Sequence, residues 1–118
     1  MDLVSVASVR ESIERYEERY LSRVYTPAEL EETAADPERL AARFAAKEAV
    51  MKVLRPTPED AVPWLSIEVR RAPGGWAELV LHGPAQALAR RSGLDGWSIS
   101  LTHEGGYGGA MAAAEVGG

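Results

Sequence analysis

Residues 37–54 read PERLAARFAAKEAVMKVL, and they predict the longest helix of this chain. Asp36 stands directly before Pro37, and a capping aspartate followed by proline is a typical helix start. The segment Arg55-Pro56-Thr57-Pro58 must end the helix, because proline cannot continue the hydrogen-bond ladder and restricts the residue before it. The alanines and Phe44 within the stretch allow close packing, so we expect a sheet to pack against this helix.

Helical signals dominate the first half of the chain, and strand signals dominate the second. In Thr26-Pro27-Ala28-Glu29, Thr26 and Glu29 can form a capping box around a proline at the first helical position. Apolar and polar residues alternate in Trp97-Ser98-Ile99-Ser100-Leu101-Thr102, as they do in half-buried strands. The expected elements are, in order, a strand at 2–6, helices at 9–24, from 26 onward and at 37–54, strands at 65–70 and 76–82, a helix at 84–91, and strands at 97–102 and 110–116. This order predicts an α+β fold with an antiparallel sheet packed against the long helix, in one domain over residues 1–118.

The composition narrows the classes of function. A net charge of −5 argues against a nucleic-acid-binding protein, which normally needs a basic surface. No apolar run approaches the roughly 18 residues of a membrane span. The chain has no cysteine, which excludes disulfides and thiolate metal sites. The first residues lack the pattern of a signal peptide, so we expect a cytoplasmic protein without a membrane or nucleic-acid partner.

Glu48 and Lys52 are four residues apart and therefore share one face of the long helix. They could form an ordinary exposed ion pair. They could instead be a carboxylate that holds Mg²⁺ beside an ammonium that binds phosphate, since magnesium often uses only one or two protein carboxylates. The spacing leaves both interpretations open.

A second cluster of charges lies on the helix predicted at residues 9–24. Arg15, Arg19 and Arg23 follow one another at four-residue steps and would form a single cationic stripe. Glutamates at 11, 14, 17 and 18 balance them, so a solvated face with internal ion pairs is the other interpretation.

The stretch RFAAKEAVMK at 43–52 resembles the signature helix of the AcpS-type phosphopantetheinyl transferases, the holo-[acyl-carrier-protein] synthase family. Three further segments resemble the family in the same order and spacing. They are Asp2-Leu3-Val4, Tyr25-Thr26-Pro27-Ala28-Glu29, and the late strand from Trp97 that ends in His103. The similarity spans nearly the whole chain, and four segments in register are a specific signal.

The resemblance implies a single-lobed phosphopantetheinyl transferase-like fold and a Mg²⁺-dependent transferase. Such an enzyme moves 4′-phosphopantetheine from coenzyme A to a serine of an apo acyl carrier protein and releases 3′,5′-ADP. Asp2 and Glu48 would be the metal ligands, and Glu48, or a water that it orients, would accept the serine proton. Glu48, Lys52 and His103 would be the catalytic residues. Lys52 would also bind the coenzyme phosphates, and His103 would also bind the coenzyme.

The resemblance also implies partners. The family forms homotrimers with active sites between subunits, and its first helix docks the acidic helix of the carrier protein. By this resemblance, Arg15, Arg19 and Arg23 would contact the carrier.

Two departures from the family pattern leave an alternative function open. Ser5 stands where the family usually has a glutamate, and residues 55–58 replace a Gly-Thr-Gly-like loop near the coenzyme. The alternative is a non-catalytic relative of the same fold that binds carrier protein or nucleotide. A structural subunit unrelated to the transferases has only the ordinary composition in its favour.

Overall fold

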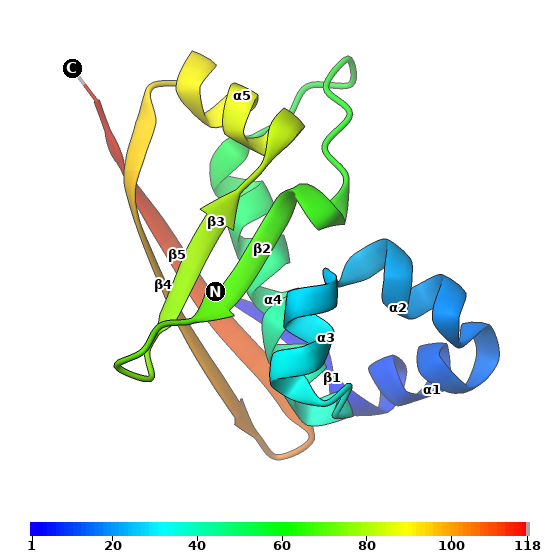
Figure 1. Cartoon of the computed structure of the whole chain (residues 1–118). Helices are drawn as coiled ribbons and strands as arrows, with labels where there is room; N and C mark the ends of the chain where they lie inside the picture. Colours follow the sequence, from blue (N-terminus) through cyan, green and yellow to red (C-terminus); the bar gives the residue numbers. More distant parts are fainter. Residues whose placement is uncertain (118) are drawn as a thin grey trace.

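Helix α4 (Pro37–Leu54) is the longest helix of the computed structural model, which describes residues 1–117 (Figure 1). Its bounds are those predicted from the sequence. The Asp36 carboxylate accepts a hydrogen bond from the Arg39 N–H at 3.2 Å and so caps the first turn. Arg55 ends the helix in a left-handed backbone conformation, with φ of 50° and ψ of 60°.

Two antiparallel sheets pack beside α4. One contains β1 (Asp2–Ser5), β5 (Tyr107–Val116) and β4 (Leu94–Glu104), in that spatial order. The other pairs β2 (Ile67–Arg71) with β3 (Ala77–Leu81). The long strands β4 and β5 run side by side along α4 (Figure 1). The predicted antiparallel arrangement against a long helix is confirmed, although the strands form two sheets.

The shorter helices follow their capping signals. Helix α3 (Pro27–Thr33) begins with the predicted capping box, in which the Thr26 N–H donates to Glu29 Oε1 at 2.8 Å and the Glu29 N–H donates to Thr26 Oγ1 at 3.2 Å. Helix α5 (Gly83–Arg91) follows β3 and carries a proline in its first turn. No helix within residues 1–117 is both long enough and apolar enough to cross a membrane.

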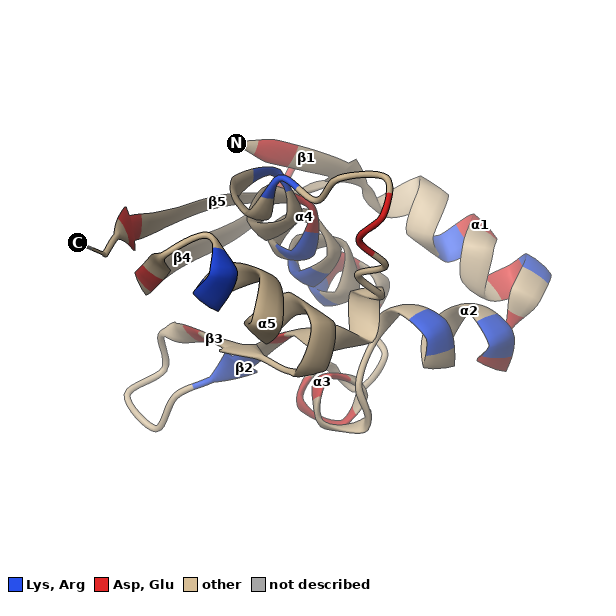
Figure 2. Cartoon of the chain, turned by 90° about the horizontal axis from the view of Figure 1, so that it is seen from above, with Lys and Arg blue, Asp and Glu red and all other residues tan. Residues whose placement is uncertain are grey.

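The prediction of a single helix at residues 9–24 is wrong, because the helix is interrupted at Glu17. Helix α1 (Val6–Tyr16) ends there and α2 (Glu18–Val24) begins, with Glu17 at φ of 48° and ψ of −124°. The two helices point in different directions and project from the molecule away from the C-terminal end of β5 (Figure 2). Arg15 therefore lies on a different helix from Arg19 and Arg23, and the three do not form one continuous stripe.

The close approach of β5 to α4 depends on small residues. A Cβ atom added to Gly108 would lie 2.3 Å from the backbone nitrogen of Ala42, so no other residue fits there without moving the helix. The facing positions of α4 include the fully buried Ala41, Ala45 and Ala46. Small side chains on α4 and a glycine on β5 therefore together allow the helix and the strand to pack closely.

A buried ion pair joins α4 to α3 and β2. Lys47 Nζ lies 2.8 Å from Glu29 Oε1, and both side chains are fully buried. Lys47 also donates to the carbonyl oxygens of Trp64 and Ile67, and Glu29 Oε2 accepts the Val69 N–H at 2.8 Å. Burial lowers the pKa of Lys47, and the charge of Glu29 opposes that shift. The pair is stable inside the protein because nearly every donor and acceptor of both groups is used.

We expect Lys47→Met to lower the free energy of unfolding by about 3–5 kcal/mol, because it leaves the Glu29 carboxylate buried without its counter-charge. Urea denaturation measures the change. Adding Glu29→Gln to Lys47→Met removes the unpaired charge and should recover part of the loss. The recovery should be incomplete, because the Thr26 and Val69 N–H groups each donate to one carboxylate oxygen and an amide nitrogen cannot accept. Arg39→Met, at an exposed position of the same helix, is the control and should have a small effect. A Lys47→Met variant as stable as the Arg39→Met variant would contradict this account.

Candidate active site

The structure brings Asp2, Glu48 and Lys52 together where β1 meets the second half of α4. Asp2 pairs with Ala110 of β5, and the alternation along β1 turns its carboxylate toward α4. Lys52 Nζ lies 2.6 Å from Asp2 Oδ1, and the lysine side chain is 71% exposed whereas that of Asp2 is 8% exposed. The spacing had left open an ion pair between Glu48 and Lys52. Among the described residues Lys52 forms its ion pair with Asp2 instead.

The two carboxylates influence each other electrostatically. Burial raises the pKa of Glu48, the negative charge of Asp2 raises it further, and Lys52 opposes the shift. Asp2 Oδ2 is buried and has no hydrogen-bond partner within residues 1–117. A buried carboxylate oxygen without a partner is costly, so this position favours a further cation or donor.

The donor set fits magnesium bound together with a substrate. Two carboxylates, one of them with a buried and unpartnered oxygen, are enough for Mg²⁺ when water and phosphate oxygens complete its shell. No group of three His, Cys, Asp or Glu residues in the described part of the chain could form a complete protein cage for a metal. Ser5 cannot supply a third carboxylate, and its hydroxyl accepts the Ser8 N–H at 3.2 Å as the N-cap of α1.

A cavity of about 610 Å³ opens beside the Asp2–Lys52 pair. Asp2, Lys52 and Arg55 supply its charges, and its apolar wall includes Leu94 and Ala112. The cavity is therefore wide enough for an anionic group that reaches Lys52 and Asp2 together.

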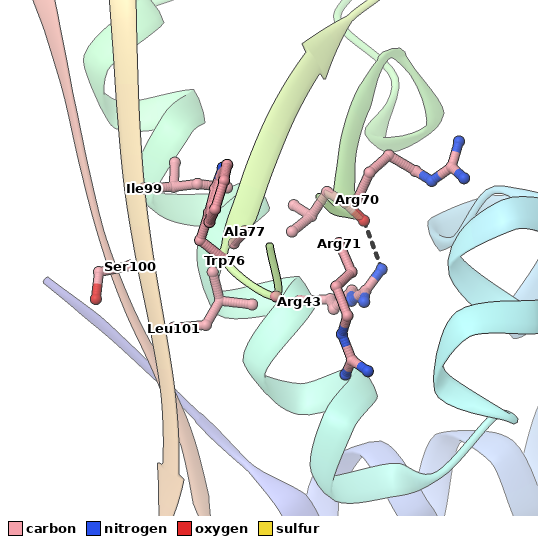
Figure 3. Close-up of a pocket in the computed structure, with 10 residues that line it drawn as sticks. Arg43, Arg70, Arg71, Trp76, Ala77, Ile99, Ser100 and Leu101 are labelled. Atoms are coloured by element: carbon pink, nitrogen blue, oxygen red, sulfur yellow. Dashed lines mark hydrogen bonds between the residues drawn. The ribbon is translucent and has the colours of Figure 1, made fainter. Parts of the chain in front are cut away.

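A second cavity, of about 330 Å³, lies between β2–β3 and β4 (Figure 3). Trp76, Ile99 and Leu101 form its apolar side, and Arg43 and Arg71 lie across from them (Figure 3). Sequence reasoning assigned no role to these arginines. The sequence does contain a signal for them: Arg70 and Arg71 stand at the end of a predicted strand, and Arg43 lies on the signature helix.

Glu32 of α3 holds the arginines of this second cavity. Its carboxylate lies 3.0 Å from Arg43 Nη1 and 2.9 Å from Arg70 Nε, and it accepts the Arg71 N–H at 3.0 Å. Burial alone would raise the pKa of Glu32, but the hydrogen bonds from Arg70, Arg43 and Arg71 outweigh it and hold the pKa below its usual value. Arg43 also donates to the Val69 carbonyl, so its guanidinium is fixed from two sides.

His103 lies with the arginines and not with the carboxylate pair. Its Nδ1 is 3.7 Å from Glu38 Oε2, at the first turn of α4, and it shares a cavity of about 250 Å³ with Arg39, Arg43 and Arg71. Glu38 and Glu48 are ten residues apart on one helix, or about 15 Å along its axis. One chain therefore presents two separate groups of residues, which we call half-sites, one with Asp2, Glu48 and Lys52 and one with His103 and the arginines.

The predicted arginine stripe is only partly assembled. Arg19 and Arg23 line a shallow cavity of about 250 Å³ on α2, together with Tyr16 and Tyr20. Arg15 does not line this cavity, although its neighbour Tyr16, the last residue of α1, does.

Comparisons with known proteins show what the chain is similar to. A sequence model described as the 4′-phosphopantetheinyl transferase superfamily matches residues 1–107. The chain is 42% identical over 106 residues to the holo-[acyl-carrier-protein] synthase of Koribacter versatilis, covering 87% of this chain and 85% of the relative. It is 43% identical over 117 residues to that of Desulforudis audaxviator, covering 97% and 88%. Among solved structures, it is similar to the Chronobacterium ammoniagenes ACPS–CoA complex, with a TM-score of 0.78, 29% identity, and coverage of 94% and 90%.

Proposed function

The chain belongs to the 4′-phosphopantetheinyl transferase superfamily, and we propose that it transfers 4′-phosphopantetheine from coenzyme A to a serine of an apo acyl carrier protein. The observation that carries the proposal is the carboxylate pair of Asp2 and Glu48, which holds a buried unpartnered oxygen beside Lys52 at an open cavity. Residues 1–118 act as one transferase domain, and we place the protein in the cytoplasm.

Asp2 and Glu48 are the residues that would hold Mg²⁺. When bound, the metal ion would neutralise negative charge on the oxygens of the coenzyme diphosphate. The exposed ammonium of Lys52 can leave Asp2 and donate charge-assisted hydrogen bonds to a phosphate.

The transfer itself needs a group that takes the serine proton. As the serine oxygen forms its bond to the phosphorus that carries pantetheine, the bridging P–O bond to 3′,5′-ADP breaks, and the hydroxyl proton goes to Glu48 or to a water that it orients.

The second half-site suits the nucleotide part of the coenzyme. His103, Arg39, Arg43 and Arg71 supply positive charge or hydrogen-bond donors for a phosphate, and the apolar wall at Trp76 suits a planar base. His103 is in this proposal a coenzyme-binding residue and contacts no reacting atom within its own chain.

A homotrimer would join the two half-sites of different subunits. The face of the three-stranded sheet that points away from α4 exposes Leu3 to 65% and Met111 to 60%, and no element of residues 1–117 covers it. Closed symmetric assembly through this face is the arrangement we propose, with the His103 end of one subunit meeting the Asp2 end of the next.

Arg19 and Arg23 are the residues we propose for docking the carrier protein. They combine positive charge with the half-exposed ring of Tyr16 on one surface, which suits an acidic helix with apolar side chains. Arg15, on the other helix, is at most peripheral to this surface.

Incubation with coenzyme A, MgCl₂ and an apo carrier protein, followed by intact-mass measurement of the carrier, should show addition of phosphopantetheine. Asp2→Asn and Glu48→Gln should each slow transfer by roughly 100-fold or more, because each removes a metal ligand or the proton acceptor. Glu31→Gln, at an exposed position of α3, is the matched control and should transfer normally. Coenzyme binding without transfer by the unmodified protein would favour the non-catalytic alternative.

Light scattering should give a trimer, and Met111→Glu should dissociate it and abolish transfer, because a charge on the outer sheet face opposes its burial. Circular dichroism should remain unchanged in this variant. Leu65→Glu places the same charge on an exposed apolar position outside that sheet and should remain trimeric. A wild-type monomer with full activity would refute the shared site.

Arg19→Glu and Arg23→Glu should each raise KM for the carrier protein by roughly 10-fold, because charge complementarity acts mainly on encounter. The affinity for coenzyme A should not change. Arg10→Glu, the same reversal at an exposed position of α1, should have little effect. Equal KM values in all three variants, with no dependence on salt, would place the carrier elsewhere.

A further inference from the structure

Arg55 adds a second cation to the cavity that contains Asp2 and Lys52. It is the first residue after α4 and three positions beyond Lys52, and it lines the same cavity of about 610 Å³. Its backbone is left-handed, with φ of 50°, a conformation that costs an L-residue free energy and is usually taken by glycine at a helix C-terminus. Arginine at this position therefore costs the fold free energy that glycine would not cost.

The loop after Arg55 is held rigidly. The Asp60 carboxylate accepts hydrogen bonds from the N–H and hydroxyl of Thr57 at 2.8 and 3.0 Å, and its other oxygen accepts Arg91 Nη2 of α5 at 2.7 Å. Pro56 and Pro58 fix two further φ angles. Ser92, directly after α5, lines the same cavity, so the loop and the cavity wall are tied to one another.

The guanidinium of Arg55 is available to a ligand. No salt bridge engages Arg55 in the region from residue 1 to 117, whereas Lys52 is paired with Asp2. A guanidinium stays charged and offers two parallel N–H donors that match phosphate oxygens. A cavity with one neutralised and one free cation has a net preference for an anion.

We propose that Arg55 is a binding residue for the diphosphate of coenzyme A and donates to its oxygens beside Lys52. This inference rests on the proposed function. Residues 55–58, which replace a glycine-containing loop of the family pattern, thus supply a side-chain donor at the position where glycine could offer only its backbone.

Isothermal titration with coenzyme A should show a Kd roughly 10-fold higher for Arg55→Ala and Arg55→Gly than for wild type, and a smaller rise for Arg55→Lys. Arg90→Ala removes an equal charge from the exposed last turn of α5 and is the matched control. Inorganic pyrophosphate, tested as a competitor of coenzyme A, should lose affinity in the same variants. In transfer assays KM for coenzyme A should rise, while kcat and KM for the carrier stay unchanged.

The thermal midpoint separates binding from folding, because Arg55→Gly relieves the left-handed backbone and should be at least as stable as wild type. If wild type fails to bind coenzyme A, the proposed function itself fails. If wild type binds and the Arg55 variants bind equally well, the assignment of Arg55 is overturned while the function stands. Equal weakening by Arg90→Ala, or unchanged pyrophosphate affinity in Arg55→Ala, would also overturn it.

Discussion

The buried ion pair between Lys47 and Glu29 fixes the rotation of α4 about its own axis. A charged pair that is fully shielded from water is tolerated only when its hydrogen bonds are complete, and these bonds run to α3 and to β2. With Lys47 turned toward those elements, the next residue, Glu48, turns toward the side where Asp2 lies. The pairing of Asp2 with Glu48 thus follows from a buried ion pair that does not line the cavity beside Asp2.

The distance between the helix and the sheet is set by a different constraint. Gly108 lets β5 approach the backbone of α4 at Ala42, and β1 is hydrogen-bonded to β5. Asp2 is therefore carried to the helix by the strand beside it, although it stands 46 positions away from Glu48 along the chain. Rotation of the helix and its spacing from the sheet together place the two carboxylates.

Local sequence signals predicted most helices and strands, whereas contacts between residues far apart in the chain could not be predicted. The caps at Asp36 and Thr26 gave the starts of α4 and α3, and the resemblance placed Asp2 with Glu48. The break at Glu17 could not be predicted, because neither proline nor glycine marks it and the apolar spacing continues past it. Lysines are usually exposed, so nothing indicated that Lys47 is buried. The arginine cavity depends on Glu32, whose partners lie 11 to 39 positions away.

The separation of the two half-sites along α4 has a genetic consequence. A chain damaged at Asp2 keeps an intact His103 end, and a chain damaged at His103 keeps an intact Asp2 end. If subunits share sites as proposed, two defective alleles expressed in one cell would form mixed assemblies in which some sites combine the intact halves. Such alleles would complement each other, whereas two alleles damaged in the same half would not.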